Sequence, residues 1–231
     1  MDPHERLDAG KKAVRERRYE DALSDYIWFH DHSLEYDETL YGVRLSFALA
    51  YWTELGEVYA PATEALKEIR DRKSKMLLEG AGDRHLFTDV YAINQHLRED
   101  QATARLFLDL SIKFPVLAKQ CAHTAMPALV KAKAYELAKA FVENPEEMVR
   151  NWSGHLNEEI TQLEAKPEKR APVRQSHTRI YIENVHDLLE VLAATGGGRE
   201  AARLRQVAVA AVKAPDVREM VEQALSSLLL P

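Results

Sequence analysis

The chain has 231 residues, of which 46% are hydrophobic and 29% are charged, a balance typical of globular proteins and not of disordered ones. Its formal net charge of −6 gives no general attraction to nucleic acids or anionic lipids. Cys121 is the only cysteine, which excludes an internal disulfide and a thiolate metal cluster. The first residues lack the apolar core of a signal peptide, and no stretch approaches the roughly 18 apolar residues of a membrane span. We therefore expect a cytoplasmic protein without a membrane partner.

The spacing of apolar residues is helical along the whole chain. Nine glycines and nine prolines are few for a fold with many tight turns, and strong helix formers such as alanine, leucine and glutamate are abundant. The one candidate for strand alternation, Arg179–Glu183, continues directly into a helical pattern. We predict an all-α fold with helices near 3–17, 20–32, 38–54, 59–79, 84–98, 101–113, 116–125, 128–143, 146–165, 173–194, 199–212 and 216–229.

Local signals mark several helix ends. Asp2 precedes a proline and is followed three residues later by a glutamate, which predicts a capping box on the first helix. Asn144 and Asp216 stand in similar contexts and predict two further helix starts. Glycines within 80–82 and 196–198 predict helix ends or loops.

A charged stretch with two prolines, residues 165–172, predicts a linker. It divides a helical array at 1–165 from a C-terminal helical segment at 171–231, which either packs on the array as a cap or forms a separate unit. The run from Leu225 to Leu230 has more apolar residues than one helix face needs. We expect this run to cap the array or to join two copies into a homodimer.

Four alanines recur within similar helical phrases. They are separated by 40, 42 and 34 residues, which is the spacing of helical-hairpin repeats. A helix pair cannot bury its apolar face alone, so successive pairs stack, and a small residue is needed where two helices cross closely. The recurrent residues are Ala22, Ala62, Ala104 and Ala138.

At these positions the chain resembles the tetratricopeptide repeat family. The matching residues are Gly10, Ala22 and Tyr26 in the first repeat, Trp52, Gly56, Ala62 and Leu66 in the second, Ala92, Ala104, Leu108 and Pro115 in the third, and Leu129, Ala138 and Val142 in the fourth. Spacings of 40 and 42 exceed the roughly 34 residues usual for the family, and Pro127 would fall inside the first helix of the fourth repeat. The resemblance implies a right-handed superhelix of antiparallel helix pairs over residues 3–143, followed by extra C-terminal helices. Another α-solenoid and a compact helical bundle stay open as alternatives.

In such an array the first helices of the pairs line a concave groove, which implies a non-catalytic scaffold or adaptor that binds a protein or peptide. The register places mixed polar and apolar residues there. These are Leu7, Lys11, Val14 and Arg15 from the first repeat, Ser46, Ala50, Thr53 and Glu54 from the second, and Asp89, Ile93 and His96 from the third. The asparagines with which some family members clamp a terminal carboxylate are absent from the matching positions, so that specialised role is not expected.

The nine histidines do not form a recognisable catalytic or metal-binding pattern. His85 and His96 share one helix face but lie about 16 Å apart along the axis, too far for one ion. Cys121 and His123 have no orienting acid, and the glycines at 196–198 lack the ending of a phosphate-binding loop. We expect no catalytic residue, metal or cofactor. The alternative is an enzyme or small-molecule binder whose polar site in the groove comprises Asp89, His96 and His123.

Two segments are basic although the chain is acidic overall. Lys11, Arg15 and Arg18 form a stripe along the first helix, and the segment from Lys113 to Lys139 holds five lysines and one acid. A solvated helix face explains both, and nucleic-acid binding is not expected because no aromatic residues for base stacking are interleaved.

Overall fold

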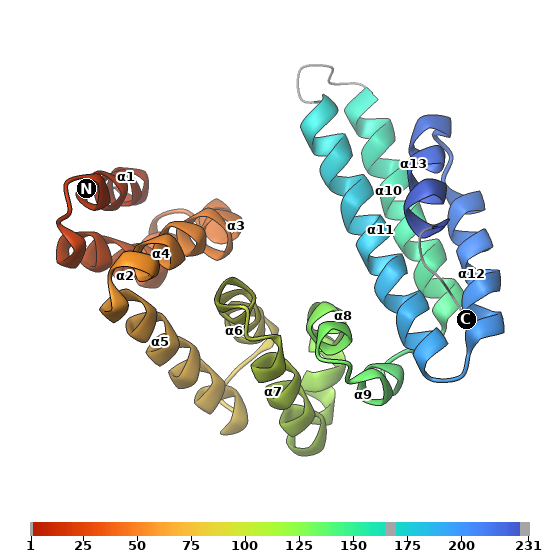
Figure 1. Ribbon diagram of the computed structural model, residues 1–231, viewed down its shortest axis with the longest axis horizontal. Coiled ribbons are helices and arrows are strands. Elements are labelled where there is room, and N and C mark those ends of the chain that lie inside the picture. The colour runs from red at the N-terminus through yellow and green to blue at the C-terminus, as the bar shows by residue number, and fades with distance from the viewer. Residues whose placement is uncertain (1, 165–169, 227–231) are drawn as a thin grey trace. The chain divides into compact units, whose positions relative to one another are not determined.

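The structure, a computed structural model, describes residues 2–164 and 170–226 (Figure 1). Within these ranges all regular elements are helices and no strand occurs, which confirms the all-α prediction. The chain divides by its internal contacts into two compact units, residues 1–128 and 129–231. This division falls inside a helix, α8 (Pro115–Lys131), whereas the boundary expected from the sequence was the linker after residue 165.

Unit 1 is built from helix pairs that follow one another along the chain. Its elements are α1 (Pro3–Arg15), α2 (Tyr19–Tyr36), η1 (Glu38–Leu40), α3 (Tyr41–Leu45), α4 (Phe47–Val58), α5 (Ala60–Leu78), α6 (Arg84–Leu97), α7 (Asp100–Lys113) and the first part of α8. Each pair, α1 with α2, α4 with α5 and α6 with α7, packs together, and α2 and α5 each pack on the first helix of the next pair. The first helices also contact in series, α1 with α4 and α4 with α6.

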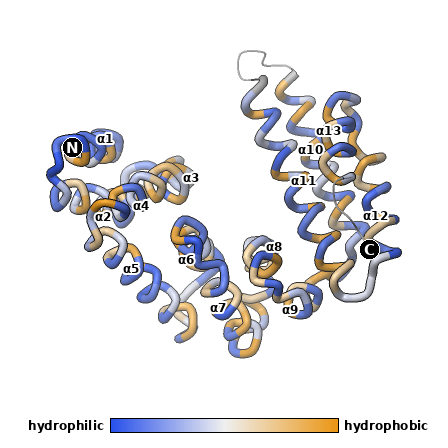
Figure 2. The backbone as a smooth tube through the Cα atoms, in the orientation of Figure 1, coloured by the Kyte–Doolittle hydropathy of each residue, from blue (hydrophilic) through white to orange (hydrophobic). Residues whose placement is uncertain are grey.

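The recurrent alanines lie in the core, as expected: Ala22, Ala62 and Ala138 are fully buried and Ala104 is 7% exposed. The close approach is clearest at Gly10, where an added Cβ would lie 2.6 Å from the Tyr26 ring. Small residues at these points therefore allow the paired helices to touch. Figure 2 shows that hydrophilic and hydrophobic residues alternate along the backbone of the helices, in agreement with amphipathic helices.

The three turns that join α1 to α2, α6 to α7 and α8 to α9 (Tyr135–Lys139) share one backbone geometry. Arg17, Arg98 and Lys133 each have a positive φ of 57–60°. At each turn, two backbone N–H groups reach back to carbonyls of the preceding helix, as in the Schellman motif that usually carries glycine. The turn from α4 to α5 differs, because Tyr59 there is extended, with φ of −140°.

Two expected helices are divided differently in the structure. The prediction of a single helix at 38–54 is wrong. The helix is interrupted at Ser46, where φ is −123° and ψ is −89°. The residues before Ser46 form η1 and α3. Conversely, the break expected at Pro127 is wrong, because α8 continues through this residue to Lys131. The helix instead ends at the turn of Lys133.

Unit 2 is a bundle around α11 (Arg170–Ala194), which packs on α9, α10 (Pro145–Glu164), α12 (Gly198–Ala211) and α13 (Pro215–Ser226). Its core is almost entirely aliphatic, with Val185, Leu189 and Leu204 fully buried. The Tyr181 hydroxyl donates to the Ala208 carbonyl at 2.8 Å, which joins α11 to α12. Residues 165–169, in the expected linker, and 227–230, in the apolar run expected to self-associate, lie outside the described residues.

The capping signals are confirmed at two helices. Asp2 and Glu5 form a capping box on α1, and the Asn144 side chain accepts from the Glu147 backbone N–H at 3.2 Å. Asp216 lies in the first turn of α13, which begins at Pro215, two residues earlier than an N-cap at Asp216 requires. Its carboxylate also accepts from the Arg174 guanidinium at 2.7 Å, which links α13 to α11.

Candidate functional site

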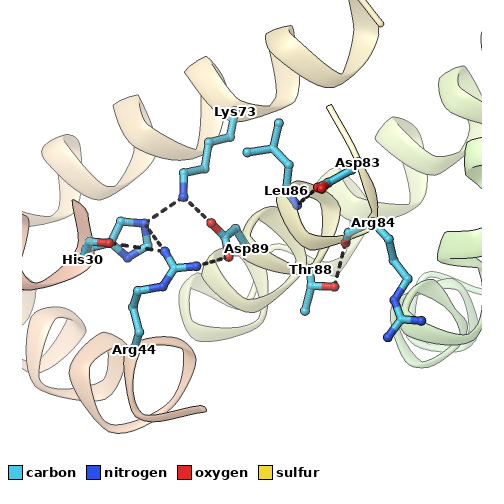
Figure 3. Close-up of polar contacts among 8 residues, drawn as sticks. All are labelled: His30, Arg44, Lys73, Asp83, Arg84, Leu86, Thr88 and Asp89. Carbon is cyan, nitrogen blue, oxygen red and sulfur yellow. Dashed lines mark hydrogen bonds and ion pairs between the residues drawn. The ribbon is translucent and has the colours of Figure 1, made fainter. Parts of the chain in front are cut away.

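Four polar side chains from four helices of unit 1 meet in what we call the buried cluster: His30 (α2), Arg44 (α3), Lys73 (α5) and Asp89 (α6) (Figure 3). One Asp89 oxygen pairs with the Arg44 guanidinium and the other with the Lys73 ammonium. The His30 Nε2 atom lies 3.0 Å from Lys73 Nζ and 3.3 Å from Arg44 Nη1. Arg44 Nη1 also donates to the His30 carbonyl at 3.3 Å.

The cluster is shielded from solvent, and this determines its protonation. His30 is 3% exposed, and Arg44 and Asp89 are each 5% exposed. Burial lowers the pKa of His30 well below 6.5, and the nearby Lys73 and Arg44 cations lower it further. His30 is therefore neutral at pH 7, and because its Nε2 faces two cationic donors, we assign the ring proton to Nδ1. Burial also lowers the pKa of Lys73, although the attraction of Asp89 opposes this shift.

This geometry favours a structural role for Asp89. Both carboxylate oxygens are engaged by cations, so neither is free to take a proton from a substrate or to bind a metal. Removing buried charges from water is costly, and paired charges with good geometry offset that cost. Among the described residues, His30 Nδ1 and Arg44 Nε are buried without a hydrogen-bond partner. The cluster thus links four helices at an energetic cost.

A second network of polar side chains joins α5, α6 and the N-terminal end of α7. Arg70 Nη1 donates to Asn94 Oδ1 at 2.8 Å and to Glu99 Oε2 at 2.5 Å. Asn94 Nδ2 in turn donates to Thr103 Oγ1 at 3.0 Å. The polar contacts between α5 and α6 therefore extend from Asp89 to Asn94, more than one turn of α6.

Residues from α1 and α4 gather on a second, more open surface. Lys11 Nζ lies 5.0 Å from the centroid of the Tyr51 ring, which is a cation–π distance. Arg15 and Glu54 are both exposed, and both act on the hydroxyl of the buried Tyr26 between them. Burial, with a smaller contribution from Glu54, raises the pKa of Tyr26 to about 12. We call Lys11, Arg15, Tyr51 and Glu54 the α1–α4 surface.

The α6 residues that we expected to line the groove are buried or partly buried in the structure. Asp89 is in the buried cluster and Ile93 is fully buried, so neither is exposed on a groove as expected. His96 is partly buried, and burial lowers its pKa, while a hydrogen bond to the Leu45 backbone opposes the shift. The physical reason is the break at Ser46, because it allows α3 to pack on α6.

The other candidate residues do not share a site with Asp89 on an open surface. The Thr53 hydroxyl donates to carbonyls of its own helix, those of Leu49 and Ala50. His123 is exposed on α8. Cys121 is buried, and burial raises the pKa of its thiol to about 11, so the thiolate is scarce at neutral pH.

The sequence pointed to Asp89 but missed its partners Arg44 and Lys73, and it missed Tyr51 as a surface residue. Arg44 is 45 positions from Asp89 and Lys73 is 16 positions from it. A helical pattern gives no signal for contacts at such separations. The one available signal was the position of a lysine, an arginine and a histidine on the inner faces of three helices, where charged residues are unusual.

Two shallow hollows are present on the surface of the separate units. One, of about 570 Å³, runs along α10 in unit 2 and is lined by Arg150, Ser153, Gly154, Asn157, Glu158, Thr161, Gln162, Ala211 and Lys213. The other, of about 360 Å³, is lined by Arg17, Arg18, Tyr19, Glu20, Asp21 and Tyr59 in unit 1. Neither contains convergent imidazole and carboxylate groups.

In the part of the chain that the structure describes, no three ligating side chains come together as a metal site would require. None of the helices there has both the length and the apolar character needed to cross a bilayer. The chain matches no family model, no curated protein and no solved structure. A function must therefore be argued from the site geometry alone.

Proposed function

We propose that the protein is a non-catalytic scaffold that binds a protein or peptide, with unit 1 forming a right-handed, tetratricopeptide-like array of antiparallel helix pairs. The observation that carries the proposal is the serial contact of α1, α4 and α6, the first helices of three stacked pairs. In such an array these helices line the binding face. The α1–α4 surface is the exposed part of that face.

The chemistry of the α1–α4 surface suits a peptide. Lys11 and Arg15 supply positive charge, Tyr51 supplies an aromatic face, and Glu54 supplies an acceptor within the same small area. Tyrosine and arginine are enriched among residues that dominate binding energy at interfaces, which favours Tyr51 and Arg15 as anchors. We expect the bound segment to carry a carboxylate that pairs with Lys11 or Arg15.

The alternative, an enzyme or small-molecule site at Asp89, His96 and His123, has less support. Asp89 is buried and held by two cations, His96 is partly buried and His123 is exposed. A catalytic site needs a base or nucleophile within reach of a substrate, in a concave and partly enclosed pocket. The two hollows described above are open and contain none of these three residues.

The proposal is tested by selecting binders from a phage-displayed library of random peptides and measuring their affinity for matched variants. Lys11→Glu should weaken the selected peptides at least about tenfold, because it reverses a charge at the centre of the surface. Lys12→Glu makes the same change one position along α1, on a side chain that is 71% exposed, and should have little effect. Equal losses in the two variants, or none in Lys11→Glu, would overturn the assignment.

A further inference from the structure

Unit 1 carries a cluster of exposed apolar side chains that no helix of the unit covers. Leu108 and Ile112 on α7 are 45% and 73% exposed, and Val116 at the start of α8 is 74% exposed. Met76, near the end of α5, is 39% exposed. We call these four residues the apolar tip. An exposed single apolar residue is ordinary, but several close together mark an interaction site.

The segments that carry these four residues meet where α5 and α7 end. A Cβ added at Gly80 would lie 3.1 Å from the ring of Phe114, so the chain just after α5 touches the chain just after α7. Met76 lies one helical turn before Gly80, and Ile112 and Val116 lie two residues on either side of Phe114. Leu108 lies one turn before Ile112 on the same face of α7.

The surroundings of the apolar tip are basic. Arg105 and Lys113 are exposed on α7, and Lys119 is exposed on α8. Asp109 is the exposed acid of this stretch of α7, and near Met76 the charges of Lys75 and Glu79 offset each other in an ion pair. The three basic side chains of α7 and α8 therefore outnumber the acid beside them. A partner that fits both features has an apolar stripe flanked by acidic residues.

We propose that the apolar tip binds an acidic amphipathic helix of a protein partner. Leu108 and Ile112 are spaced by four residues, so they form a stripe along α7 that matches the stripe of an apposed helix. Arg105 and Lys113 lie at the two ends of this stripe with Asp109 midway between them, so we expect the acidic residues of the bound helix to lie opposite the two ends. This surface is formed by α5, α7 and α8 and is distinct from the α1–α4 surface, so the inference stands independently of the peptide groove.

A charge-selection experiment tests the proposal on the full chain. The probe is a displayed library of amphipathic helices in which a leucine stripe is fixed and every polar position is randomised. We expect the selected helices to be enriched in aspartate and glutamate. The double variant Arg105→Glu with Lys113→Glu should reverse this preference toward lysine and arginine, because it reverses the charge beside the stripe without altering the apolar contacts.

Two further variants locate the binding. Ile112→Asp should weaken the selected helices at least about tenfold, because it places a charge in the centre of the apolar contact. Ile180→Asp makes the same change at an apolar residue of α11 that is 48% exposed, and it should leave binding unchanged, as should Lys11→Glu. Circular dichroism on each variant shows whether the fold is intact.

Several outcomes would overturn the inference. One is the selection of basic helices by the wild-type chain, and another is equal binding by Ile112→Asp with its fold intact. Binding to phosphatidylserine vesicles in place of any helix would identify the tip as a membrane surface. A concentration-dependent mass in light scattering that Ile112→Asp abolishes, without helix binding, would identify the occupant as a second copy of the chain.

Discussion

The cores of the two units are made in different ways. In unit 1, the buried carboxylates of Asp89 and Asp25 join different helices through ion pairs: Asp89 pairs with Arg44 and Lys73, and Asp25 pairs with the partly exposed Arg6 at 2.6 Å. In unit 2, the buried polar residues among those described are Ser153 and Thr178. Their hydroxyls bond to carbonyls of their own helices, Arg150 and Arg174, and join nothing else.

The difference follows from the two architectures. In the bundle of unit 2, α11 is surrounded by neighbours and can bury aliphatic side chains on several sides. In unit 1 each helix pair packs mainly on the pair before and the pair after. A buried ion pair discriminates strongly between registers, because a shifted helix leaves a charge unpaired. Buried ion pairs thus help to specify the stacking in unit 1, whereas the buried core of unit 2 is specified by apolar packing.

The largest expected effect is that of breaking the buried cluster. Asp89→Ala leaves Arg44 and Lys73 buried without their counter-charge, which should destabilise unit 1 by about 3–5 kcal/mol. Urea unfolding followed by the fluorescence of Trp52, which is 1% exposed in unit 1, measures this loss. Asp71→Ala, which removes a carboxylate that is 68% exposed, is the control and should cost less than about 0.5 kcal/mol.

A triple replacement tests whether the buried cluster adds net stability or only fixes the register of the helices. Arg44→Met, Lys73→Met and Asp89→Leu together turn the cluster into an apolar contact like those of unit 2. Replacing a buried ionic group by apolar residues of similar volume is often neutral or stabilising. The triple variant should therefore regain most of the stability that Asp89→Ala loses. If it is as unstable as the single variant, the cluster contributes net stability and the contrast between the units is wrong.

A smaller effect is expected from pH, with opposite signs in the two units. Burial lowers the pKa of His30 in unit 1, so below pH 6.5 the unfolded chain binds a proton that the folded unit does not. Stability of unit 1 is then lost as the pH falls through 6.5, by up to about 1.4 kcal/mol per pH unit for one group. His96 acts in the same direction, because burial lowers its pKa too.

In unit 2 the sign is reversed. A hydrogen bond to Asp187 raises the pKa of His186, and Glu190 adds to this shift. The resulting stability is present below pH 6.5 and is lost as the pH rises through the raised pKa. Hydrogen exchange by mass spectrometry, resolved by segment, should show unit 1 opening more and unit 2 opening less when the pH falls from 7.5 to about 5.5. His186→Gln should remove the response of unit 2 alone; parallel responses of the two units in the wild type would contradict the assignment.

The smallest effect is expected at the repeated turns. Arg98 adopts a left-handed backbone conformation, with φ of 60°, that costs a residue with a side chain about 1 kcal/mol and costs glycine little. Arg98→Gly should therefore stabilise unit 1 by roughly 0.5–1 kcal/mol in urea unfolding. Arg105→Gly, in the exposed middle of α7, should destabilise by about the same amount. Stabilisation by both changes would show that the turn geometry is not the cause.

The sequence predicted what local chemistry decides. The caps at Asp2 and Asn144 and the buried alanines follow from residues a few positions apart, so they were found. The break at Ser46 was missed because no proline or glycine marks it; there the chain turns so that α3 can pack on α6, which lies forty residues or so further along. Asp89 was recognised as a polar residue on a helix, but its burial depends on Arg44 and Lys73, which only the fold brings near.

The break at Ser46 also explains an irregularity in the repeat. The interval from Ala22 to Ala62 is 40 residues, longer than the roughly 34 of a regular helical-hairpin repeat, and the extra length corresponds closely to η1 and α3. This added segment contains Arg44, which pairs with Asp89 of α6. The ion pair between α3 and α6 therefore depends on residues beyond a regular hairpin period. Deleting η1 and α3 would shorten this interval and remove the ion pair, whereas the 42-residue interval from Ala62 to Ala104 would stay long.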